Sequence, residues 1–176
     1  MPQQVTVRTV EQFDERELQG LSDVLIDCVE GGASVSFMWP MTRDKALTYW
    51  RGVAASAASG ERIVLAAYDA AETIVGTVQV VFAQPENQPH RADIAKMLVH
   101  RRARRHGAGQ ALLVAAEHRA LEAGKTVLVL DTASPDAERL YVRQGWQLCG
   151  QIPDYALMPD GAFCATTVFY KSLRGP

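Results

Sequence analysis

Residues 101–113, RRARRHGAGQALL, place four arginines and a histidine before two glycines and a leucine-rich run. The preceding segment, ADIAKMLV, reads as a strand that ends at Val99, and an apolar repeat of three and four residues begins near Gly109. The stretch is therefore a turn from a strand into a helix. The first N–H groups of a helix have no partner inside it and lie at the positive end of its dipole. Glycines let the main chain approach an anion closely, so the turn predicts a phosphate site.

Two other interpretations of this basic turn remain open. It could be a solvated surface loop, or it could contact nucleic acid. The chain has a formal net charge of -2, which is not the basic excess of a dedicated nucleic-acid binder. No GxxxxGK[ST] or GxGxxG motif is present, so the usual nucleotide-loop patterns do not apply.

The remaining segments alternate between strand and helix patterns. We expect strands over 5–10, 62–68, 73–82, 92–99, 126–132, 146–152 and 163–171, and helices over 12–30, 42–59, 109–123 and 135–144. The apolar run 126–132 is typical of a strand covered on both faces, and 153–161 is expected to be a loop. This order predicts one mixed α/β domain, residues 1–176, with helices on both faces of its sheet.

Composition narrows the class of protein. Cys28, Cys149 and Cys164 form an odd set without metal-ligand spacing, which indicates reduced structural cysteines and no metal site. The start of the chain lacks an export pattern, and no apolar run approaches the roughly 18 residues of a membrane span. We therefore expect a cytoplasmic protein with no membrane or nucleic-acid partner.

The motif Arg104-x-x-Gly107-x-Gly109, between ADIAKMLV and QALLVAAEH, resembles the acetyl-CoA-binding motif of the GNAT acetyltransferases. The similarity continues through LVLDTASPDAERLYVRQGWQ, which ends in Tyr141, Gly145 and Trp146. The resemblance implies a mostly antiparallel twisted sheet of about seven strands, with a splayed parallel pair and about four helices. It also implies acetyl-CoA as cosubstrate, with the loop amides on its pyrophosphate.

Three shorter segments, GGASVSFM, RADIAKMLV and LDT, resemble the tabtoxin-resistance branch of that family. This resemblance implies transfer of an acetyl group to a primary amine of a small polar toxin or antibiotic. Acetyltransferases of aminoglycosides, including kasugamycin-type compounds, share the same frame. Acetylation of a protein or peptide amine and a non-catalytic acyl-CoA-binding module are the alternatives. The assembly is open between monomer and homodimer.

Acetyl transfer to an amine needs a base, donors for the developing oxyanion and an acid for the departing thiolate. The resemblance places Asp93 and Asp131 on neighbouring strands, where each is a candidate for the base or for a substrate anchor. It gives Tyr141 the role of the acid. The implied cofactor contacts are Met97, Leu98, Val99, Arg104, Arg105, His106, Gly107, Ala108, Gly109 and Gln110, the first three through main-chain N–H groups.

The acceptor site is expected among the early helices and the loops. Phe37 and Trp39, in the apolar loop GGASVSFMWP, and Glu30 are substrate candidates beside Asp93 and Asp131. Further acidic residues that could attract a cationic acceptor, or lie on a solvated surface, are Asp27, Asp154 and Asp160.

Overall fold

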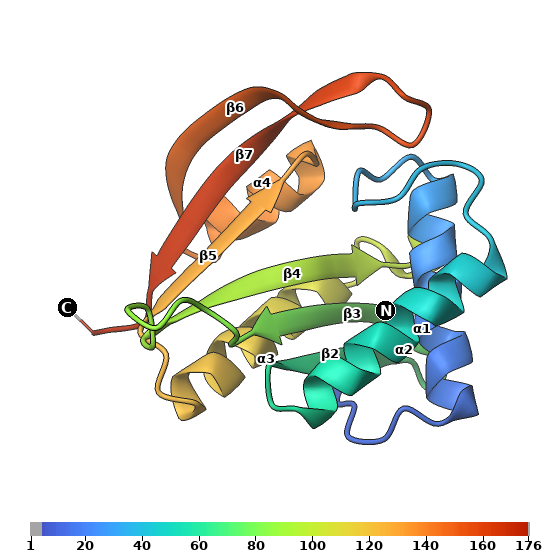
Figure 1. Ribbon diagram of the computed structural model, residues 1–176, viewed down its shortest axis with the longest axis horizontal. Helices are drawn as coiled ribbons and strands as arrows, with labels where there is room; N and C mark the ends of the chain where they lie inside the picture. Colours follow the sequence, from blue (N-terminus) through green and yellow to red (C-terminus); the bar gives the residue numbers. More distant parts are fainter. Residues whose placement is uncertain (1–4, 176) are drawn as a thin grey trace.

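The computed structural model describes residues 5–175, which form one seven-stranded sheet with helices on both faces (Figure 1). The elements in chain order are β1 (Thr6–Thr9), α1 (Glu15–Glu30), α2 (Arg43–Ala58), β2 (Arg62–Tyr68), β3 (Ile74–Val81), β4 (Arg91–Val99), a 3₁₀ turn (Arg101–Ala103), α3 (Ala108–Glu122), β5 (Val127–Thr132), α4 (Pro135–Arg143), β6 (Gln147–Leu157) and β7 (Phe163–Ser172). No helix within the described range is long and apolar enough to cross a membrane.

The strand order is β1-β2-β3-β4-β5-β7-β6, and every neighbouring pair is antiparallel except β4 and β5. Those two parallel strands pair only between 91–93 and 127–129. Beyond that point they diverge, and Figure 1 shows the wedge that opens between them. The predicted fold class, a mostly antiparallel sheet with one splayed parallel pair, is confirmed.

A bulge in β4 explains the divergence. Gln79 of β3 pairs with Ala95, whereas Thr77, two residues earlier, pairs with Leu98. One extra residue is thus inserted in β4, and Lys96 within this segment takes the left-handed φ of 50°. An inserted residue bends a strand and increases its twist, which turns the second half of β4 away from β5.

Two hydrophobic cores fill the space on either face of the sheet. On one face, α1 and α2 bury Leu21, Leu25 and Trp50 against the strands. On the other face, α3 contributes Leu112 and Leu113 to the second core. The helix starts follow local capping: the side chains of Asp14, Thr42 and Ser134 each accept a main-chain N–H of the first turn.

Two sequence predictions about the late strands were wrong. The segment 153–161 is not all loop, because β6 continues to Leu157. Its pairing with β7 shifts register between Ile152 and Ala156. As an edge strand, β6 tolerates a proline that donates no ladder hydrogen bond. In β5 only Leu128 and Leu130 are buried, so this strand is fully covered on one face rather than on both.

Candidate functional site

The turn before α3 has the geometry that an anion site requires. Gly107 adopts a φ of 87° and caps the helix without a side-chain hydrogen bond. The first N–H with an acceptor in the helix is that of Ala111, which donates to the Gly107 carbonyl. The N–H groups of Ala108, Gly109 and Gln110 therefore remain available at the positive end of α3. A Cβ on Gly109 would lie 3.3 Å from Cδ2 of Leu140, so glycine also lets α3 pack closely against α4.

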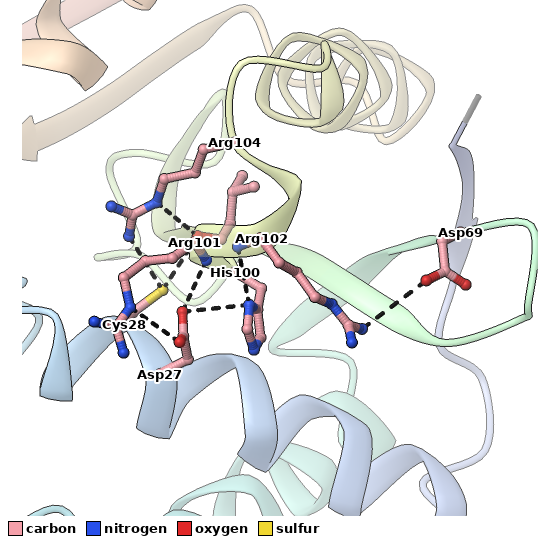
Figure 2. Close-up of polar contacts among 8 residues, drawn as sticks. Asp27, Cys28, Asp69, His100, Arg101, Arg102 and Arg104 are labelled. Carbon is pink, nitrogen blue, oxygen red and sulfur yellow. Dashed lines mark hydrogen bonds and ion pairs between the residues drawn. The ribbon is translucent and has the colours of Figure 1, made fainter. Parts of the chain in front are cut away.

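Asp27 of α1 holds the basic stretch in place (Figure 2). Its carboxylate accepts the Arg101 main-chain N–H at 2.8 Å and the Arg101 Nε–H at 3.0 Å, and it lies 3.5 Å from His100 Nδ1. Burial by itself would raise the pKa of Asp27. The hydrogen bonds from Arg101 outweigh this effect, so the pKa lies below its usual value. Asp27, a sequence candidate for attracting the acceptor, instead anchors the loop.

The other basic side chains of the turn have different surroundings. Arg104 donates from Nε to the Val99 carbonyl at 3.0 Å, and its Nη2 lies 3.8 Å from Cys28 Sγ (Figure 2). Burial raises the pKa of that thiol. Arg105, with a φ of 63°, and His106 are exposed. Like Arg104, these two side chains lie at the surface beside the N-terminus of α3.

A cleft of about 450 Å³ fills the wedge between β4 and β5. Met97, Leu98 and Val99 line it, together with Arg104 of the basic turn. Because β4 has no strand on its β5 side after Asp93, its main-chain groups there are not used by the sheet. The cleft thus offers main-chain hydrogen-bonding groups to a ligand. Gly107 and Gln110 of the α3 turn line a separate depression between α3 and β1.

Tyr141 of α4 forms part of the cleft wall. Its ring packs against Trp146 and Phe169, with centroid separations of 5.9 and 5.7 Å, and the residue is 3% exposed. Burial raises the pKa of Tyr141, and the negative charge of Asp131 raises it further. The hydroxyl is therefore protonated at physiological pH.

Asp131, near the end of β5, lies where this cleft meets a second cavity of about 340 Å³. Its Oδ2 accepts the Thr166 hydroxyl hydrogen at 2.6 Å, which orients the carboxylate. The second cavity lies between loop 31–42 and the β6–β7 hairpin, and Phe37, Met38 and Tyr155 line it. Ser34 Oγ donates to the Leu157 carbonyl at 3.0 Å, so the loop and the hairpin are joined directly.

Three predicted substrate residues lie elsewhere. Asp93 is ion-paired with Arg91 and accepts a hydrogen bond from Gln84, and it lines neither cavity. Glu30 lines a separate depression of about 270 Å³ at the other side of the basic stretch. Trp39 is 49% exposed, donates its indole N–H to the Val29 carbonyl and also lies outside both cavities. Of the acidic and aromatic candidates, the structure brings together Asp131, Tyr141 and Phe37.

The other acidic surface candidates also line neither cavity. Asp154 is an exposed residue of β6, and Asp160 accepts the Ala162 main-chain N–H in the hairpin turn.

Sequence reasoning missed Lys96, Ser36, Thr166 and Cys28, which line one or both cavities. Lys96 carried a usable signal, because it is the basic residue inside the otherwise largely apolar strand ADIAKMLV. Thr166 and Ser36 carried none, since a hydroxyl in a strand or loop is common and their contacts are to distant parts of the chain.

Comparison with known proteins identifies the family to which this chain belongs. The profile of the acetyltransferase (GNAT) family matches residues 20–146, and this chain belongs to that family. An uncharacterized N-acetyltransferase from Azospirillum brasilense is 32% identical over 130 residues, which span 72% of this chain and 74% of that protein.

Two solved structures with acetyl-CoA bound share the fold. A phosphinothricin acetyltransferase from Sinorhizobium meliloti superposes with a TM-score of 0.79 at 17% identity, covering 96% of this chain and 88% of that one. The acetyltransferase yncA from Salmonella typhimurium superposes with a TM-score of 0.75 at 18% identity, covering 98% and 95%. At these identities the similarity establishes the GNAT fold.

Proposed function

We propose that this chain is a cytoplasmic, acetyl-CoA-dependent N-acetyltransferase that modifies a primary amine of a small polar toxin or antibiotic. Tabtoxin-like amino acids and aminoglycosides are the candidate acceptors, and resistance by detoxification is the proposed role. The observation that carries the proposal is the meeting of two cavities at one carboxylate, Asp131. One cavity reaches Arg104 of the basic turn, and the other lies between a loop and a hairpin.

The residues of the first cavity, together with the turn into α3, fit coenzyme A. The N–H groups of Ala108, Gly109 and Gln110 would hold the pyrophosphate, with Arg105 and His106 beside them. Main-chain groups of Met97, Leu98 and Val99 would bind the pantetheine arm and the acetyl carbonyl. Acetyl-CoA supplies an activated acetyl group as a thioester.

Asp131 is the proposed base or amine anchor. An alkylamine has a pKa near ~10, so most of it is protonated at neutral pH and must lose a proton before it attacks. The Asp131 carboxylate lies at the junction of the cavities, where it can bind the ammonium group and accept its proton directly or through water. Asp93 is not part of this proposal for the described structure, because its carboxylate is engaged with Arg91 and Gln84.

Tyr141 is the proposed acid. It lines the same cleft as Asp131, and its neutral hydroxyl can donate a proton to the departing thiolate. Asp131 and Tyr141 thus place a proton acceptor and a proton donor around one cleft.

The size of the second cavity favours a small acceptor over a protein. Two hydrogen bonds join loop 31–42 to the β6–β7 hairpin. One is donated by the Ser34 hydroxyl, and the other runs from the main-chain N–H of Trp39 to the Pro159 carbonyl at 3.0 Å. A volume of about 340 Å³ matches a small molecule.

The test is thiol release from acetyl-CoA in the presence of a panel of amines: aminoglycosides, tabtoxin-like amino acids, polyamines and short peptides. We expect turnover with small amines and none with peptides. Binding of acetyl-CoA without turnover on any amine would support the non-catalytic alternative instead.

A further inference from the structure

Lys96 occupies an unusual position in the cleft. It belongs to the β4 bulge, has a φ of 50° and lines the cavity opposite Asp131 of β5. The left-handed region is unfavourable for a residue with a Cβ and is found where the surroundings enforce it. The bulge that splays the two strands therefore also delivers a lysine into the space between them.

The Lys96 ammonium reaches across the cleft. Its Nζ donates to Ser36 Oγ at 2.8 Å, and Ser36 also lines the second cavity, where the acceptor is proposed to bind. An ammonium group has three donors, and this contact uses one of them. Lys96 is thus directed to the boundary between the cleft and the second cavity.

No acidic group among residues 5–175 forms a contact ion pair with Lys96. The charges that act on it are Asp131, which favours the ammonium form, and Arg62 of β2, which disfavours it. The Asp131 Oδ2 atom already accepts the Thr166 hydroxyl hydrogen. Burial lowers the pKa of Lys96. A partly desolvated ammonium without a close counter-ion is a favourable partner for an anion from outside the protein.

We propose that Lys96 binds an acid group of the acceptor, so that the substrate is a small amine that also carries a carboxylate or a similar anion. This inference rests on the proposed function and narrows its substrate class. The acceptor amine lies toward Asp131, and its acid group lies toward Lys96. A polycation such as an aminoglycoside would instead meet the positive charges of Lys96 and Arg62, which disfavours that part of the proposed range.

The kinetic test compares matched acceptors, each as the free acid and as its carboxamide: L-methionine with L-methioninamide, and 4-aminobutanoic acid with 4-aminobutanamide. The acid-to-amide ratio of kcat/KM is measured for the wild type and for Lys96→Met. Taking this ratio in both proteins cancels the different amine pKa values of the two compounds. We expect the ratio to fall by about 10- to 100-fold in Lys96→Met, chiefly through KM, and to recover in part in Lys96→Arg.

Two control variants separate recognition from a structural role. Ser36→Ala removes the hydrogen bond that directs the Lys96 ammonium but keeps its charge, so it should lower the acid-to-amide ratio by less than Lys96→Met does. Lys125→Met removes a lysine that donates to the Pro89 carbonyl outside both cavities and should leave the ratio unchanged. Equal loss for acid and amide in Lys96→Met would overturn the proposal while leaving the acetyltransferase function intact.

A binding measurement covers the case in which none of these amines is acetylated. With the wild type labelled at its lysine side chains, titration with each acid and amide is followed by NMR at the Lys96 Cε signal, assigned by its loss in Lys96→Met. Acids should shift this signal and amides should not. The absence of any acid-dependent shift refutes the anion site, whereas a shift without turnover refutes the proposed enzyme alone.

Discussion

Replacing Tyr141 by phenylalanine removes one hydroxyl from the cleft wall and leaves the ring in place. The ring centroids of Trp146 and Phe169 lie 5.9 and 5.7 Å from that of Tyr141, so the packing of α4 on the sheet is retained. The groups that perturb the pKa of Tyr141 include no hydrogen-bond partner. We therefore expect the free energy of unfolding to change by less than about 1 kcal/mol, and the Tm by less than about 4 °C.

The rate should respond far more strongly than the stability. Loss of a positioned general acid typically lowers a rate by about 10²-fold or more, which corresponds to roughly 2.7 kcal/mol in the activation free energy. Because burial and the Asp131 charge raise the pKa of Tyr141, the hydroxyl keeps its proton up to about pH 10 in the wild type. No decline in wild-type rate between about pH 8 and pH 10 should therefore come from Tyr141.

The assay is single-turnover thiol release, with acetyl-CoA compared with an acyl donor whose thiol is more acidic. The deficit of Tyr141→Phe should shrink with the better leaving group, because a more stable thiolate needs less protonation. Tyr170→Phe is the matched control, since this tyrosine bonds Gln147 on the outer strands and lies outside both cavities. A Tyr141→Phe variant with the wild-type rate, where chemistry limits turnover, would refute the assignment.

Gly109→Glu adds a Cβ 3.3 Å from Leu140 and a negative charge at the start of α3. Because this charge repels a phosphate group, calorimetry should show at least a tenfold loss of coenzyme A affinity. Unchanged affinity in the folded variant would place the pyrophosphate elsewhere. Asp131→Asn should lower kcat by about 10²-fold with little change in acetyl-CoA binding, and a purely raised KM would identify an anchor instead of a base. Asp27→Asn should lower the free energy of unfolding at pH 7 by about 1 to 2 kcal/mol. The pKa of Asp27 in the folded protein lies below its unfolded value of about 3.9. The contribution of Asp27 to the free energy of unfolding is therefore complete above that value and is lost as the pH falls below it. Chemical denaturation at pH 7 and near pH 3 should show that the loss of stability caused by Asp27→Asn is smaller in acid.

Local patterns in the sequence were sufficient for most of the secondary structure. The strand at 62–68 was predicted to the residue, and Thr42 and Pro135 were correctly placed at helix starts. The turn at Gly107 was also recognisable. Capping, backbone preferences and apolar periodicity act over a few neighbouring residues, so these features can be predicted from the sequence alone.

Other features depended on contacts between distant segments. Asp93 and Asp131 looked equivalent in sequence, yet Asp93 pairs with Arg91 while Asp131 meets Thr166 at the junction of two cavities. The extension of β6 to Leu157 depends on its pairing with β7.

Lys96 reaches the cleft because the register of β4 on β3 inserts a bulge, and its partner Ser36 lies sixty residues away. Strand register and loop packing are settled by which side chains meet across the fold, and that information is spread over the whole chain. The sequence alone thus determined most of the elements and the turn into α3, whereas the tertiary structure decided which carboxylate lies at the junction of the two cavities and which lysine lines the cleft.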